Sequence, residues 1–190
     1  MDGDDVIDEI FELFRRYGDL RYGEDVTQLD HVLQAAQIAR EDGADDNLIA
    51  AALLHDIGQF LNDAGRAADD HGVDARHETQ GAEVLAKRFP PAVSEPVRLH
   101  VTAKRYLCAV EPGYEAALSR ASALSLRLQG GALDAAERAR FEAEPFFPDA
   151  VRLRRYDDCG KRQDWPAPAL ESYRPLLARL VLPGAPVTPM

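Results

Sequence analysis

The chain has 190 residues, of which 33 are acidic and 22 basic, so its formal net charge at pH 7 is −11. This acidic balance argues against a nucleic-acid-binding surface, and no apolar run approaches the roughly 20 residues that span a bilayer. The length predicts one domain over 1–182, followed by a disordered tail over 183–190. Two cysteines without a CxxC pairing and an acidic N-terminus without a secretory signal favour a cytoplasmic protein. We expect a monomer or a small homo-oligomer.

Helical periodicity fills the first half of the chain. Helices are expected over 6–17, over 28–41, from about 46 to near Gly58, and from 77 to the proline pair at 90–91. Thr27 is expected to cap the second of these helices, and Asp45 or Asp46 the third. The polar stretch 62–76 is too long for a tight turn and is typical of a loop over a site.

Helical periodicity continues through the second half of the chain. Helices are expected over 93–107, 114–128, 134–143, 150–161 and 168–182, and no stretch makes a convincing strand. The sequence therefore predicts an all-α helical bundle, the architecture in which metal and cofactor sites are built from facing helices.

Candidate metal ligands recur about once per predicted helix. They are imidazoles and carboxylates without a thiolate, a donor set that suits Fe, Mn, Co, Ni or Zn. The six candidates are His31, His55, Asp56, His77, His100 and Asp157. Six ligands exceed what one catalytic ion needs, whereas two ions sharing Asp56 would each keep open positions. The alternative is that the histidines are unrelated capping or core residues.

Polar side chains also recur at helical spacing in the second half. Lys104 follows His100 by one turn, and Ser122 and Gln129 lie seven residues apart. Arg154 precedes Asp157 by three residues, which places both on one face of a helix. These spacings direct several polar groups toward the predicted metal ligands.

The sequence motifs around these residues are more specific for a protein family than the spacing of the residues is. The relevant segments read Tyr22-Gly-Glu24, Ala51-Ala-Leu-Leu-His55-Asp56-Ile-Gly, His77-Glu-x-x-Gly81, His100-Val-x-Ala-Lys104-Arg105-Tyr106-Leu107, Gln129-Gly-Gly, Phe141-Glu-x-x-Pro-Phe-Phe and Leu153-Arg154-Arg-Tyr156-Asp157-Asp158. Over about 19–161 the chain resembles the HD-domain superfamily. Within it, the chain looks most like the mixed-valent di-iron oxygenases of phosphonate catabolism, with inositol oxygenase as a more distant relative. The resemblance implies a single HD-type helical domain.

The resemblance also implies a reaction and a cofactor. Members of this group use two iron ions, Fe(II) and Fe(III), and O₂ to cleave the C–P bond of a 1-hydroxyphosphonate. The products are a carboxylic acid and phosphate. Examples of the substrate are 2-amino- and 2-trimethylammonio-1-hydroxyethylphosphonate, which yield glycine and glycine betaine. The expected partner is therefore a small anionic phosphonate, and neither nucleic acid nor a membrane.

Roles for individual residues follow from the resemblance. One iron is assigned His31, His55, Asp56 and Asp157, and the other is assigned His77 and His100, with Asp56 as the bridge. The phosphonate is assigned Lys104, Ser122, Gln129 and Arg154. The open position of the site is assigned Tyr22 and Glu24 as gating residues, with Glu24 near the amino end of the substrate.

Gln59 departs from the family pattern. Relatives commonly have a histidine that helps to bind the phosphonate at this position, and an amide can donate a hydrogen bond but cannot carry charge near neutral pH. The identity of the phosphonate is therefore open. Two other functions also remain open. One is a metal-dependent phosphohydrolase acting on a phosphate ester or nucleotide, because the same ligands can activate water. The other is a non-catalytic, metal-stabilised binding module.

Overall fold

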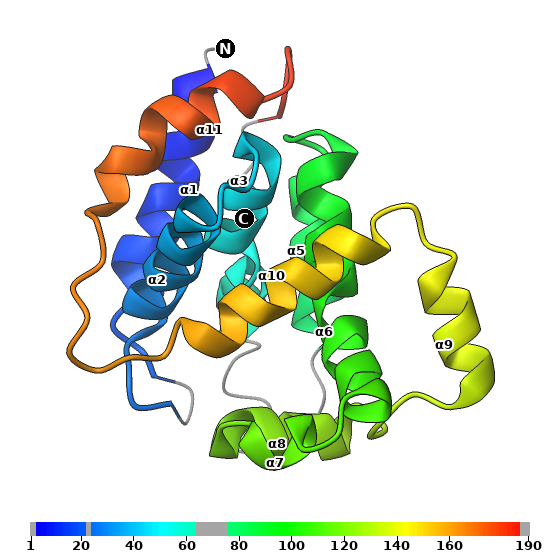
Figure 1. Cartoon of the computed structure of the whole chain (residues 1–190). Coiled ribbons are helices and arrows are strands. Elements are labelled where there is room, and N and C mark those ends of the chain that lie inside the picture. The colour runs from blue at the N-terminus through cyan, green and yellow to red at the C-terminus, as the bar shows by residue number, and fades with distance from the viewer. Residues whose placement is uncertain (1–2, 22–23, 64–75, 187–190) are drawn as a thin grey trace.

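The computed structural model describes residues 3–21, 24–63 and 76–186. Within these ranges every regular element is helical, which confirms the predicted all-α class (Figure 1). None of the described helices combines the length and the apolar character that a bilayer crossing requires.

The first half of the chain contains short helices with the expected caps. They are α1 (Gly3–Tyr17), α2 (Gln28–Glu41), α3 (Asp46–Leu54), the 3₁₀ helix η1 (Ile57–Asp63) and α5 (His77–Leu85). The Thr27 hydroxyl accepts the N–H of Asp30 at 3.1 Å, and the Asp45 carboxylate accepts the N–H of Leu48 at 2.9 Å. Both capping predictions are confirmed.

The third helix ends earlier than predicted. Helix α3 stops at Leu54, so His55 and Asp56 lie in the turn that joins α3 to η1 and not on a helix that continues to Gly58. Phe60 then packs edge-on against Phe14 of α1, with ring centroids 5.5 Å apart. This aromatic contact anchors η1, and with it the turn that carries the His-Asp pair.

The second half contains α6 (Pro91–Val110), α7 (Tyr114–Ala117), α8 (Arg120–Leu128), α9 (Ala135–Glu142), α10 (Phe147–Cys159), η2 (Leu170–Tyr173) and α11 (Arg174–Leu180). The single helix expected over 114–128 is wrong. Leu118 is extended, and the Ser119 hydroxyl accepts the N–H of Ser122, which starts α8 as a new helix. The helix expected over 168–182 is also divided, because Pro175 has no N–H to continue the helical hydrogen bonds from η2.

Helix α6 is central to the packing, with α3, α5 and α10 against it, while α2 packs on α3 and α10 (Figure 1). Helices α1 and α11 lie together on one flank, and α9 lies on the other (Figure 1). The main apolar cluster is built from α1, α2, α3 and the neighbouring helices, with Phe11, Phe14 and Leu53 fully buried. A rigid core on both sides of α3 therefore holds the His-Asp turn in place.

The C-terminal residues are described as far as 186. Ala185 is buried and belongs to the main apolar cluster, and its N–H donates to the carbonyl of Leu182. Residues 187–190 of the predicted tail lie outside the described residues. The domain limit at 182 stays a prediction.

Replacement of Gly58 with alanine is expected to destabilise the protein by about 3 kcal/mol. A Cβ at this position would lie 1.9 Å from the carbonyl oxygen of His77 and 2.8 Å from the backbone nitrogen of Gly81, so backbone would have to move. Thermal unfolding measures the loss. Gly3→Ala is the matched control, because its Cβ would meet only Val181, at an ordinary 3.5 Å. Equal stability of the two variants would contradict the close packing of η1 on α5.

Candidate metal centre

The predicted ligands converge from five parts of the chain. The contributing elements are α2, the turn after α3, α5, α6 and α10. Two groups form, each with ligand atoms within 4.8 Å of one another. The first triad contains His31, His55 and Asp157, and the second contains Asp56, His77 and His100. The triads divide the six residues as the resemblance implied, except that Asp56, which was assigned to both metal ions, groups only with the second triad.

Asp56 lies between the two triads. Its Oδ2 is 3.7 Å from Nε2 of both His31 and His55, whereas its Oδ1 is 3.4 Å from Nε2 of His77. Each oxygen of this carboxylate therefore faces a different triad. This is the arrangement that a carboxylate needs to bridge two ions.

The ring nitrogens of three histidines are fixed by main-chain carbonyls. Nδ1 of His31, His55 and His100 lies 2.8, 2.8 and 2.7 Å from the carbonyl oxygens of Gly160, Ala52 and Val97. A carbonyl oxygen only accepts, so Nδ1 carries the proton and Nε2 offers a lone pair.

These lone pairs face one another. Nε2 of His31 is 3.1 Å from Nε2 of His55, and Nε2 of His77 is 3.2 Å from Nε2 of His100. In the pair His31 and His55 both atoms are acceptors, and two acceptors at this distance repel unless a proton or a cation lies beside them. Together with two buried carboxylates and no thiolate, this donor set fits divalent or trivalent ions such as iron.

The electrostatics also fit a cation site. Burial lowers the pKa of His55, and it lowers the pKa of His100 to about 3, so both rings are neutral. Although burial opposes the charged form, the neighbouring imidazoles hold the pKa of Asp56 well below its usual range. Arg154 and Lys161 do the same for Asp157 against its burial. Neutral imidazoles beside ionised carboxylates are the protonation states that metal binding requires. His31 and His77 differ from His55 and His100, because Asp157 and Asp56 raise the pKa of these two rings against their burial.

Lys104 lies beside this centre without a direct ion pair in the described part of the chain, although the more distant Asp157 and Asp158 favour its charged form. Its side chain is 2% exposed, and Nζ donates to the Ser125 hydroxyl at 2.7 Å. Among the described residues, no carboxylate lies within ion-pair distance of this ammonium. Burial, with Arg154 adding to it, lowers the pKa of Lys104 to about 7. A buried ammonium held by a neutral hydroxyl is typical of a site that receives an anion.

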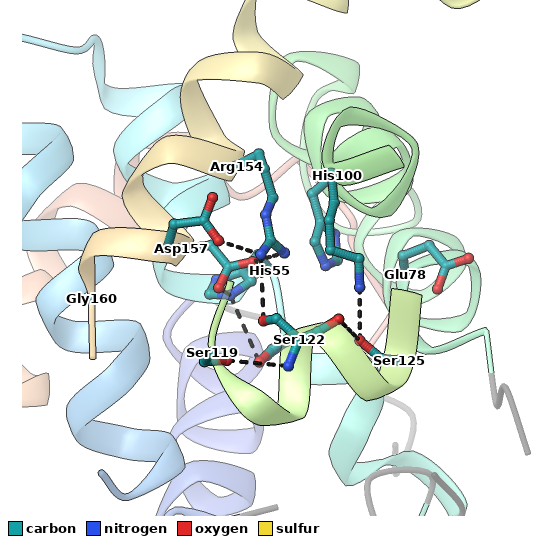
Figure 2. Close-up of polar contacts among 12 residues, drawn as sticks. His55, Glu78, His100, Ser119, Ser122, Ser125, Arg154, Asp157 and Gly160 are labelled. Carbon is teal, nitrogen blue, oxygen red and sulfur yellow. Dashed lines mark hydrogen bonds and ion pairs between the residues drawn. The ribbon is translucent and has the colours of Figure 1, made fainter. Parts of the chain in front are cut away.

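Arg154 is occupied by neighbouring groups (Figure 2). Its Nη1 donates to Asp157 Oδ2 at 2.6 Å, Nε donates to the Tyr114 hydroxyl at 3.1 Å, and Nη2 pairs with Asp158. Nη2 also lies 3.5 Å from the Ser122 hydroxyl. The guanidinium therefore orients the metal ligand Asp157 and borders the site at Ser122.

Helix α8 closes the site on the side of Glu24. Its N-cap Ser119 and its residues Ser122 and Ser125 face the cluster (Figure 2). The Glu24 carboxylate accepts from Ser119 at 2.7 Å and from Lys161 Nζ at 2.8 Å. Lys161 Nζ also donates to the Ser122 hydroxyl at 3.0 Å. Glu24 and Ser122 are thus joined through a cation that the sequence did not single out.

Three residues that the resemblance assigned to the substrate pocket or its opening remain to be placed. Gln129 caps the C-terminus of α8, and its Oε1 is buried without a hydrogen-bond partner among the described residues. Gln59 lies in η1, half-buried, and its backbone N–H donates to the Asp56 carbonyl at 2.9 Å. Tyr22 lies outside the described residues.

Sequence reasoning missed Lys161 and Tyr114. Lys161 follows Asp157 by four residues and lies 3.6 Å from Asp157 Oδ1. The four-residue spacing within the helix expected over 150–161 is the signal that could have found it, although α10 itself ends at Cys159. Tyr114 bonds to Asp158 and Arg154 from a separate helix, so no local spacing indicated it.

Comparisons with known proteins agree with this geometry. A model of the HD domain matches residues 29–137. The chain is 44% identical to a 1-hydroxy-2-(trimethylamino)ethylphosphonate dioxygenase of Leisingera caerulea, an enzyme that forms glycine betaine. The alignment spans 177 residues and covers 93% of this chain and 90% of the relative. It is also 48% identical to a hydroxymethylphosphonate dioxygenase of Gimesia maris. That alignment spans 169 residues and covers 88% of this chain and 84% of the relative. The chain therefore belongs to the HD-domain family, in the group that contains these phosphonate dioxygenases.

Proposed function

We propose that this protein is a di-iron oxygenase that uses O₂ to cleave the C–P bond of a small 1-hydroxyphosphonate. The observation that carries the proposal is the pair of triads around Asp56 beside the buried ammonium of Lys104. The names of the relatives favour an oxygenase over a phosphohydrolase.

The two triads would hold the iron ions. His31, His55 and Asp157 would bind one ion, His77 and His100 would bind the other, and Asp56 would contribute one oxygen to each. When bound, the iron pair would supply the redox chemistry with O₂ that no side chain of this chain can supply.

Lys104 would bind the phosphonate. Its ammonium is buried, and Ser125 holds it by a single hydroxyl, so a dianionic headgroup would provide the missing counter-charge. The Ser122 hydroxyl and the Gln129 amide would add hydrogen bonds, with Arg154 along the same wall. Gln59 would replace the usual histidine with an uncharged donor. Several fixed partners would orient C1 of the substrate, which is the positioning that an oxygenase requires.

The reaction balances with O₂ alone. For hydroxymethylphosphonate, one O₂ gives formic acid and phosphate. The C–P bond breaks, C1 is oxidised to the carboxyl level, and both atoms of O₂ are consumed. No external reductant is needed, so the chain needs only the metal centre and the substrate pocket.

The test is an assay of phosphate release by the iron-loaded protein, in air and under argon. The substrates are hydroxymethylphosphonate and 1-hydroxy-2-(trimethylamino)ethylphosphonate, with a panel of nucleotides beside them. We expect phosphate release from at least one phosphonate, in air only, with one O₂ consumed per phosphate. Release from nucleotides under argon with manganese or cobalt would instead establish a phosphohydrolase.

A further inference from the structure

His77 differs from the other three histidines in what lies behind its ring. The Nδ1 atoms of His31, His55 and His100 each face a main-chain carbonyl at 2.7–2.8 Å. His77 is the first residue of α5, so its own helix provides no carbonyl behind it. Its Nε2 nevertheless points into the second triad, 3.4 Å from Asp56 Oδ1. The proton on Nδ1 therefore needs another acceptor.

Glu78 offers that acceptor. Its Oε2 lies 3.7 Å from Nδ1 of His77, and its side chain is only 13% exposed. The same Oε2 is buried and has no hydrogen-bond partner among the described residues. Figure 2 shows Glu78 on the other side of His100 from Asp157 and Arg154. An unpaired buried carboxylate oxygen is costly unless it has a partner when the site is filled.

We propose that Glu78 is a positioning residue for the second metal ion and acts through His77. Its carboxylate accepts a hydrogen bond from Nδ1–H, which fixes the tautomer that presents Nε2 to the metal. Its negative charge also makes the imidazole a stronger ligand than the carbonyl-bound rings. This inference rests on the proposed two-metal centre, but it concerns a residue outside both triads.

A purely structural role for Glu78 makes a different prediction. Glu78 lies in the first turn of α5, where a negative charge also interacts favourably with the helix dipole. Loss of that interaction would lower the stability of the metal-free protein. Because α5 carries His77, that loss would weaken the second ion only together with a lower melting temperature of the metal-free protein.

The experiment measures Fe(II) binding to the full chain by equilibrium dialysis under argon, with the melting temperature of the metal-free protein recorded beside it. We expect two ions in the wild type. In Glu78→Gln the second ion should bind about 10- to 100-fold more weakly, as for other residues that orient a metal ligand, while the first is unchanged. Glu83→Gln is the matched control, because Glu83 is an exposed glutamate on the same helix.

Glu78→Asp keeps the charge on a shorter side chain, so its second-ion affinity should lie closer to the wild type than that of Glu78→Gln. The reverse order would overturn the inference. So would an unchanged second-ion affinity in Glu78→Gln, or a weaker second ion that comes with a lower melting temperature of the metal-free protein. A wild type that binds fewer than two ions would overturn the two-metal proposal as well, which separates the two failures.

Discussion

Replacement of Asp56 with alanine is expected to lower the rate of phosphate release by at least about 10³-fold, because even residues that only orient a ligand contribute about 10- to 100-fold. The two oxygens of Asp56 face different triads, at 3.4 Å from His77 and 3.7 Å from His31. One substitution therefore removes a ligand from both metal positions. Phosphate assays and iron counts after dialysis measure the two effects.

The iron count gives the sharper comparison. Asp56→Ala is expected to weaken both ions, whereas His31→Ala should weaken the ion of the first triad more than the other. Asp164→Asn is the control, because Asp164 is exposed and lies outside the site. If Asp56→Ala loses only one ion, Asp56 belongs to a single metal position and the bridged centre is wrong.

Local signals predicted the helices well where a cap was encoded in a few residues. Thr27 and Asp45 each accept a backbone N–H three residues on, as the sequence indicated. Asp134 does so within a full capping box with Glu137. These bonds join neighbours in the chain, so spacing alone identifies them.

One failure has a tertiary cause and the other a local one. The His55–Asp56 turn is set by the packing of Phe60 on Phe14, which lies 46 residues earlier, and no helix stop signal marks Leu54. The break at Leu118 depends on Ser119, a cap that sits inside an otherwise continuous helical pattern.

The site shows the same division. The sequence offered the ligand types, but the facing Nε2 atoms of His31 and His55 come from α2 and the turn after α3, and no spacing encodes how these two segments pack. The link from Lys161 to Glu24 joins residues 137 apart in the chain, so only the folded structure reveals it. The roles of the individual side chains in binding substrate stay predictions.

Replacement of Lys104 with methionine, which keeps the length but removes the charge, is expected to lower kcat/KM by at least about 100-fold. A buried hydrogen bond to a charged group contributes roughly 1.5–3 kcal/mol, and misplacement of the reacting carbon adds to the loss. Substrate titrations under argon separate binding from turnover. Lys87→Met is the control, because Lys87 is exposed. Unchanged affinity for the phosphonate would place the anion elsewhere.

The same substitution is expected to stabilise the metal-free protein, most strongly at low pH. Burial lowers the pKa of Lys104 from 10.5 to about 7 in the folded protein, so between these values the unfolded chain holds more protons than the folded one. The free energy of unfolding therefore rises with pH across this window, and the full penalty of the buried charge applies below pH 7. Lys104→Met removes that penalty, so its melting temperature should exceed that of the wild type at pH 6 by more than at pH 9. The charge of Lys104 would thus lower the stability of the metal-free protein, although the same charge strengthens binding of the phosphonate. If the variant melts lower than the wild type at pH 6, the ammonium has a stabilising partner and is not held ready for an anion.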